Sequence, residues 1–206
     1  MLVGLDFDNT IVCYSKAIEV LSASYLDLPK ELGKEKTVIK NYLAEAKRGE
    51  EWTQFQGLLY SKGLEYAEPY NDVVDVMQEL TDIGCNLCII SHKTKEPFAG
   101  PSYDLHTAAA KWIDKHLRCR GLVNGDGDVV FRPTKESKIK EIESRGCDVF
   151  LDDLYEILHH CDFPRETRGV LFNPGSNQSV KNALSCVGDW AEFRDLVIDM
   201  MADMWK

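Results

Sequence analysis

The sequence has no long hydrophobic run and no excess of positive charge, and each absence argues against a class of protein. No apolar stretch in the 206 residues reaches the roughly 20 residues that a membrane-spanning helix needs. The formal net charge is −10, so nucleic acid and anionic membranes, which are both negatively charged, are disfavoured as partners. We therefore expect no nucleic-acid partner and no membrane partner.

The cysteines and the first residues bear on the cellular compartment. Seven cysteines are an odd number, and most lie in apolar stretches, which is typical of reduced and buried thiols. Cys85 and Cys88 have the spacing of half a zinc site, but no second pair follows at that spacing, so we interpret them as core residues. Met1 leads directly into an apolar stretch without a signal-peptide pattern, and we expect a cytoplasmic protein.

The first ten residues combine an apolar strand with two carboxylates. The stretch 2–5 is continuously apolar, which is typical of a strand buried on both faces in a parallel sheet. Side chains alternate along a strand, so Asp6 and Asp8 are predicted to point the same way and Phe7 to pack on the opposite side. Two neighbouring negative charges need compensation, and Mg²⁺ prefers such oxygen ligands.

Polar residues recur at the ends of later predicted elements. The apolar stretch 87–90 ends at Ser91, and the stretch 149–151 ends at Asp152 and Asp153. Between them, Lys138 stands at the start of a helical pattern. Lys135 lies near the same helix start and remains an alternative to Lys138.

In this order, the residues resemble the four motifs of the haloacid dehalogenase (HAD) superfamily, whose commonest members are Mg²⁺-dependent phosphatases. The segment 6–10, Asp-Phe-Asp-Asn-Thr, resembles the DxDx(T/V) first motif, and Ser91 the second. Lys138 and the acidic pair at 152 and 153 resemble the third and fourth. Receiver domains of signalling pathways also arrange Asp, Ser or Thr and Lys around Mg²⁺, but the Asp-x-Asp at the first strand argues against that class.

The resemblance implies a role for each matching residue. Asp6 is the predicted nucleophile, and Asp8 is the predicted general acid and base. The predicted phosphate-binding residues are Ser91, Lys138, Asn9 and His92. The predicted ligands of Mg²⁺ are Asp6, Asp8 through its backbone carbonyl, Asp153 and Asp152.

The alternation of strands and helices predicts an α/β fold, a Rossmann-like three-layer sandwich with a mainly parallel central sheet. The predicted strands are 2–5, 87–90, 129–131, 149–151 and 170–172. Short helical patterns between the first strand and Pro69 resemble the helical C1 cap of the superfamily. We therefore predict a core made of 1–13 and 68–206 and a cap made of 14–67. Candidate substrate contacts in the cap are Tyr14, Arg48 and Trp52, with simple packing and solvation as the alternative.

The predicted function is Mg²⁺-dependent hydrolysis of a small phosphorylated metabolite, such as a sugar phosphate or a nucleotide, through an aspartyl-phosphate. An Asp at position 8 favours phosphate-ester chemistry, because superfamily members that only dehalogenate lack an acid and base there. Two alternatives remain open: a phosphomutase or phosphotransferase of the same superfamily, and a HAD-like binding or regulatory protein without turnover. The sequence is compatible with a monomer or a homodimer.

Overall fold

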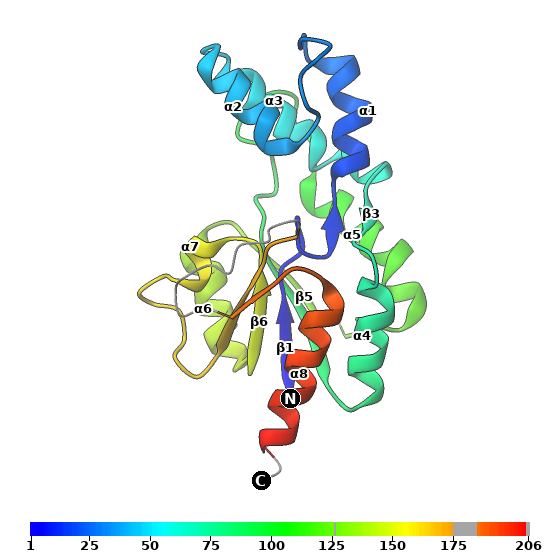
Figure 1. Cartoon of the computed structure of the whole chain (residues 1–206), viewed down its shortest axis with the longest axis vertical. Coiled ribbons are helices and arrows are strands. Elements are labelled where there is room, and N and C mark those ends of the chain that lie inside the picture. Colours follow the sequence, from blue (N-terminus) through cyan, green and yellow to red (C-terminus); the bar gives the residue numbers. More distant parts are fainter. Residues whose placement is uncertain (126, 175–184, 205–206) are drawn as a thin grey trace. The chain divides into compact units, whose positions relative to one another are not determined.

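The computed structural model describes residues 1–125, 127–174 and 185–204, and the chain forms two compact units (Figure 1). The larger unit is made of Met1–Ile11, Pro69–His92 and His116–Lys206, and the smaller unit of Val12–Glu68 and Lys93–Lys115. The predicted cap segment 14–67 lies within the smaller unit. This unit also contains 93–115, which the sequence predicts to be part of the core.

A parallel sheet forms the centre of the larger unit. Its strands are β1 (Leu2–Leu5), β4 (Asn86–His92), β5 (Val129–Arg132), β6 (Val149–Asp152), β7 (Arg168–Phe172) and β8 (Ser185–Val187). They lie in the order β5-β4-β1-β6-β7-β8, and every neighbouring pair is parallel. The predicted α/β class is therefore confirmed, and β8 is an additional strand. From β1 the sheet continues through β4 and β5 on one side and through β6, β7 and β8 on the other. The strand order therefore reverses at β1, and open α/β sheets bind ligands at such a point.

Helices cover both faces of this sheet and give the predicted three layers (Figure 1). On one face lie α6 (Lys135–Arg145), against β4 and β5, and α7 (Tyr155–Leu158), against β6 and β7. On the other face, α4 (Val73–Asp82) packs against β4 and α8 (Trp190–Met204). A short 3₁₀ turn, η2 (Arg118–Arg120), completes this unit. No helix in the described ranges is both long and apolar enough to cross a membrane.

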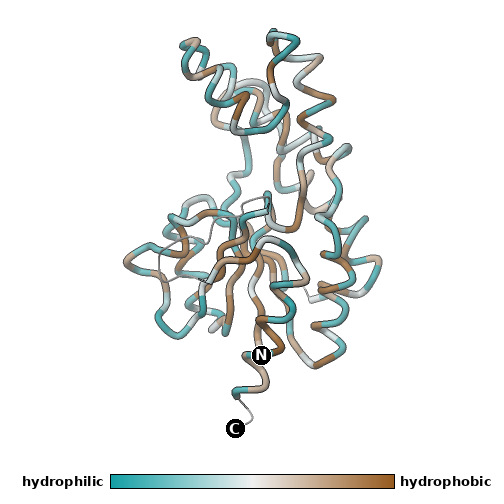
Figure 2. The backbone as a smooth tube through the Cα atoms, viewed as in Figure 1, coloured by the Kyte–Doolittle hydropathy of each residue, from teal (hydrophilic) through white to brown (hydrophobic). Residues whose placement is uncertain are grey.

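The hydrophobic core follows the strands, whose backbone is coloured mostly as hydrophobic in Figure 2. Between the sheet and the pair α6 and α7 lies a cluster of buried residues: Cys88, Ile90, Ile142, Cys147, Phe150, Leu158 and Leu171. On the α8 side, the Trp190 ring packs against Phe172 and Phe193. Strands buried on both faces in this way explain why the sequence shows continuous apolar runs rather than an alternating pattern.

The smaller unit is mainly helical. It contains α1 (Ser15–Tyr25), α2 (Lys36–Glu45), α3 (Gly49–Leu59), the 3₁₀ turn η1 (Lys62–Glu65) and most of α5 (Leu105–His116). Two short strands, β2 (Val12–Cys13) and β3 (Glu68–Pro69), pair with each other. The Trp112 indole of α5 donates a hydrogen bond to the Ala67 carbonyl at 2.9 Å, and this contact ties α5 to the earlier part of the unit.

Candidate active site

Asp6 directly follows the central strand β1 and is almost completely buried, with 4% of its surface exposed. Its backbone N–H donates to the Leu151 carbonyl at 2.9 Å, which continues the pairing of β1 with β6 beyond the strand. The Thr10 hydroxyl donates to Asp6 Oδ2 at 3.3 Å. Phe7 is fully buried and its ring meets that of Phe131, 6.4 Å away between centroids. The carboxylate of Asp6 is therefore held in place at the end of β1.

The loop after β1 turns sharply. Asn9 adopts a left-handed backbone conformation with φ +62°, which Asn tolerates better than most residues, and the Ile11 N–H donates to the Phe7 carbonyl at 3.1 Å. Asp8 and Asn9 are half-buried in this turn. The Trp190 indole of α8 donates to the Thr10 carbonyl at 3.2 Å. Nothing in the local sequence pattern links residue 190 to the first strand, so this contact could not be predicted from the sequence.

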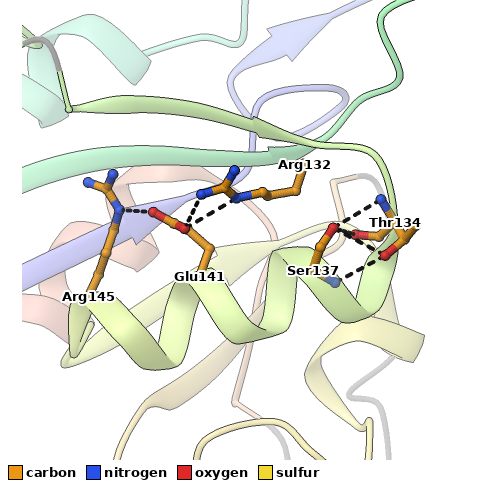
Figure 3. A network of polar contacts seen from close by, with 5 residues as sticks. All are labelled: Arg132, Thr134, Ser137, Glu141 and Arg145. Carbon is orange, nitrogen blue, oxygen red and sulfur yellow. Dashed lines mark hydrogen bonds and ion pairs between the residues drawn. The ribbon is translucent and has the colours of Figure 1, made fainter.

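Lys138 reaches the site from the first turns of α6. The helix begins after Thr134, whose hydroxyl accepts from the Ser137 N–H at 3.1 Å while the Ser137 hydroxyl accepts from the Thr134 N–H at 3.1 Å (Figure 3). This capping box fixes where the helix starts, and Lys138 directly follows Ser137, in the first turn. Its fully buried ammonium donates to Asp6 Oδ1 at 2.5 Å and to Asp152 Oδ2 at 2.6 Å.

The two candidate lysines are placed differently. Lys135 forms an ion pair with Glu156 of α7 and is half-buried. Lys138 instead joins the ends of β1 and β6. Of the two, the structure therefore brings Lys138 to the predicted nucleophile.

The acidic pair completes a cluster of carboxylates. Asp152 is fully buried at the end of β6 and accepts from the Leu154 N–H at 2.9 Å, while Asp153 is half-buried. One oxygen from each of Asp6, Asp152 and Asp153 lies within 4.8 Å of the others. Carboxylate oxygens at such separations are ligands that suit Mg²⁺, so the donor set fits the predicted metal.

The electrostatics of the cluster also favour a cation. Burial by itself lowers the pKa of Lys138, but the charges of Asp152 and Asp6 outweigh burial and hold this pKa above its ordinary value. Burial raises the pKa of Asp152 to about 6, with Lys138 opposing the shift and Asp6 adding to it. A single ammonium therefore compensates the carboxylates only in part, and a divalent cation would lower the cost of keeping them ionised.

Ser91 lies at the end of β4, on the neighbouring strand. The pairing of Leu5 with Ile89 places Ser91 level with Phe7, at the edge of the sheet where Asp6 and Asp152 lie. Its hydroxyl is buried and has no hydrogen-bond partner among the described residues. Since buried polar atoms are almost always paired, this oxygen is suited to an incoming ligand. His92 follows, and its Nε2 lies 3.1 Å from the Pro133 carbonyl oxygen.

The candidate substrate residues of the smaller unit are engaged with their own neighbours. Tyr14 is 2% exposed and its ring meets that of Tyr60 edge-on, with 5.2 Å between centroids. Trp52 is 7% exposed and packs beside Phe55. Arg48 donates to both carboxylate oxygens of Glu51 at 2.7 Å and to the Asp27 carbonyl at 2.9 Å. Their contact with substrate stays a prediction.

Comparison of the sequence with protein-family models gives no match, and comparison with curated proteins gives none either. Solved structures do resemble the chain. A haloacid dehalogenase-like family hydrolase from Streptococcus pneumoniae has a TM-score of 0.62 at 12% identity, with 95% of this chain and 97% of that one covered. A protein from Clostridium acetobutylicum described as a predicted phosphatase has a TM-score of 0.62 at 18% identity, with 96% and 98% covered.

A HAD phosphatase from Thermococcus onnurineus is also similar, with a TM-score of 0.55 at 20% identity and with 95% of this chain and 97% of that one covered. Other similar structures are described as dehalogenases. At these identities the likeness shows the fold alone. The chain therefore has the fold of HAD-like hydrolases over nearly its whole length, as the motifs implied.

Proposed function

We propose that this chain is a cytoplasmic, Mg²⁺-dependent phosphatase of the HAD superfamily that hydrolyses a small phosphorylated metabolite. The observation that carries the proposal is the contact of Lys138 with both Asp6 and Asp152. With Asp153 close by, these residues form a buried and highly charged centre at the strand ends. Charged groups concentrated in this way are typical of catalytic sites, because burying them contributes little to stability.

In the proposed first step, a carboxylate oxygen of Asp6 attacks phosphorus. A bond forms between this oxygen and phosphorus, the ester bond between phosphorus and the leaving oxygen breaks, and Asp8 gives its proton to the leaving oxygen. The contacts from Lys138 and Thr10 orient Asp6 for this attack. The Ser91 hydroxyl and the Lys138 ammonium would donate hydrogen bonds to the phosphoryl oxygens, where negative charge develops.

In the second step, water attacks the aspartyl-phosphate and the bond between Asp6 and phosphorus breaks. Asp8 takes the proton of the water, which returns both aspartates to their starting forms. Asp6, the Asp8 backbone carbonyl, Asp152 and Asp153 would hold Mg²⁺, which when bound neutralises negative charge on the phosphoryl group. Hydrolysis rather than dehalogenation is favoured by Asp8, since dehalogenation needs no group that donates a proton to a leaving oxygen.

The test is phosphate release from para-nitrophenyl phosphate with and without Mg²⁺, followed by a panel of sugar phosphates and nucleotides. We expect release that requires Mg²⁺ and falls by about 10⁴-fold or more in Asp6→Asn. Asp199→Asn, which removes one exposed carboxylate on α8, is the matched control and should leave the rate unchanged. Full activity of Asp6→Asn, or no release from any ester, would overturn the proposal.

A further inference from the structure

Two buried thiols face each other in the core of the larger unit. Cys88 lies in β4, Cys147 lies two residues before β6, and both are 2% exposed. Their Sγ atoms are 3.9 Å apart although 59 residues separate them in the sequence. Cys85, the other member of the C-x-x-C pattern, instead contacts Met201, with 3.4 Å between its Sγ and Sδ. The pairing in space therefore differs from the pairing that the sequence spacing indicates.

A glycine in β1 provides the room for this approach. β1 lies between β4 and β6, and Gly4 pairs in register with Cys88 on one side and with Phe150 on the other. A Cβ at position 4 would lie 2.9 Å from the Cys147 Sγ and 2.5 Å from a carbon of the Phe150 ring. A side chain at position 4 would therefore force the Phe150 ring or the Cys147 thiol to move, and Gly4 leaves this space free.

The two thiols also have different acidities. The hydrogen bond between the two thiols lowers the pKa of Cys88, burial opposes this shift, and the positive charge of Arg145 adds to it. The same hydrogen bond and burial raise the pKa of Cys147. A lowered pKa favours the thiolate, which is the nucleophilic form of a cysteine.

We propose that Cys88 and Cys147 form a redox-active dithiol pair, which a peroxide oxidises to an intramolecular disulfide. The Cys88 thiolate attacks one oxygen of hydrogen peroxide, so a sulfur–oxygen bond forms, the oxygen–oxygen bond breaks and hydroxide leaves. The Cys147 sulfur then attacks the Cys88 sulfur, a sulfur–sulfur bond forms and the sulfenic oxygen leaves as water. Two electrons pass from the thiols to the peroxide. The two peroxide oxygens, with the peroxide hydrogens and the two thiol protons, leave as two water molecules.

Disulfide formation would act on the sheet itself. The sulfurs must approach from 3.9 Å to about 2.05 Å, which draws β4 toward the start of β6. Ser91 lies three residues beyond Cys88, and Asp152 five residues beyond Cys147, so both elements lead to the candidate site. The inference rests on the distance between the two thiols, supported by their acidities, and does not depend on the proposed phosphatase activity.

The test is a disulfide map of the folded full-length chain. The protein is exposed to hydrogen peroxide, its remaining thiols are alkylated, and its peptides are analysed by mass spectrometry without reduction. Cys119 and Cys161 are exposed, so the double variant Cys119→Ser/Cys161→Ser serves beside the wild type to prevent links between molecules. We expect a cross-link between the peptides that contain Cys88 and Cys147, which dithiothreitol reverses.

Two further variants identify the partners. Cys85→Ser should keep the cross-link, because Cys85 contacts Met201 rather than either thiol. Cys147→Ala should lose it and leave Cys88 as a sulfenic acid that dimedone traps. A link between Cys85 and Cys88, or recovery of both Cys88 and Cys147 as free thiols after the exposed cysteines have been oxidised, would overturn the proposal. The wild-type map decides this even where a variant fails to fold.

Discussion

The strand ends of the larger unit and the helices of the smaller unit both carry charged residues with predicted roles, but these residues find partners in different ways. At the strand ends, Lys138 contacts Asp6 and Asp152, which are distant in the sequence. In the smaller unit, Arg48 pairs with Glu51, only three residues away. Parallel strands bring distant residues to one edge, whereas exposed helices pair their charges locally.

The largest expected effect comes from removing the buried cation. Lys138→Met keeps the length of the side chain but leaves Asp6 and Asp152 buried without their shared partner. We expect the free energy of unfolding to fall by about 3–5 kcal/mol. Arg48→Met, the matched change in the smaller unit, should have little effect because its partner is exposed. Urea unfolding at neutral pH measures the free energy of unfolding of both variants. Equal losses in Lys138→Met and Arg48→Met would show that the charged contacts of the two regions contribute equally to stability.

The same contrast explains which features the sequence predicts. The ends of β1, β4 and β6 follow from apolar runs and from the rule that parallel strands end at one edge, so Asp6, Ser91 and Asp152 were placed correctly on strand ends. The apolar pattern that begins directly after position 138 favoured Lys138 over Lys135, while the capping box at Thr134 is known only from the structure. Catalytic and ligand roles stay predictions, because geometry alone does not test them.

Contacts that depend on tertiary packing could not be predicted from the sequence. No local pattern assigns 93–115 to the smaller unit, joins Trp190 to the loop after β1, or brings Cys147 beside Cys88. β8 was missed because Ser185–Val187 is short and carries little of the apolar signal that marks a buried strand. Each of these features is set by which elements pack together rather than by the residues of one segment.

Mg²⁺ should stabilise the larger unit selectively. At a concentration about 100-fold above its dissociation constant, a bound ligand adds about 2.7 kcal/mol to the free energy of unfolding. Asp153→Asn should remove most of this gain, because it takes one carboxylate from the cluster, while Asp199→Asn should keep it. Hydrogen exchange should slow at amides of β1 and β6 and stay unchanged in α2. Equal slowing in α2, or a full gain in Asp153→Asn, would contradict a metal site at the strand ends.

A smaller effect is expected from the helix caps. Thr134→Ala removes the side chain that caps α6 and should lower the free energy of unfolding by about 1 kcal/mol. Glu35 occupies the equivalent position before α2 but makes no side-chain cap hydrogen bond, so Glu35→Ala is the matched control with a smaller expected loss. Thr134→Ala should also slow phosphate release, since the cap fixes the helix start that positions Lys138. Equal losses of stability in Thr134→Ala and Glu35→Ala would mean that the cap hydrogen bonds of Thr134 do not stabilise α6.

The smallest effect concerns Glu141, which is half-buried in the larger unit and bridges two arginines (Figure 3). Its carboxylate oxygens accept from Arg132 Nη2 and Arg145 Nε, each at 2.6 Å. Burial alone would raise the pKa of Glu141, but the hydrogen bonds and charges of both arginines outweigh it and lower the pKa. Because the lowered pKa belongs to the folded state, the stabilisation is present above the unfolded-chain pKa of about 4.3 and is lost as the pH falls through the folded value.

Glu141→Gln should therefore lower the free energy of unfolding by about 0.5–1 kcal/mol at neutral pH, and the difference should shrink as the solution is acidified. Urea unfolding of wild type and variant across the acidic range measures this convergence. Glu51, whose pKa is lowered in the same direction by Arg48 in the smaller unit, gives the comparison through Glu51→Gln. The pair of Arg48 and Glu51 is exposed, so Glu51→Gln should lower the free energy of unfolding by less than Glu141→Gln does. A difference for Glu141→Gln that stays constant down to low pH would mean that packing, rather than charge, holds this bridge.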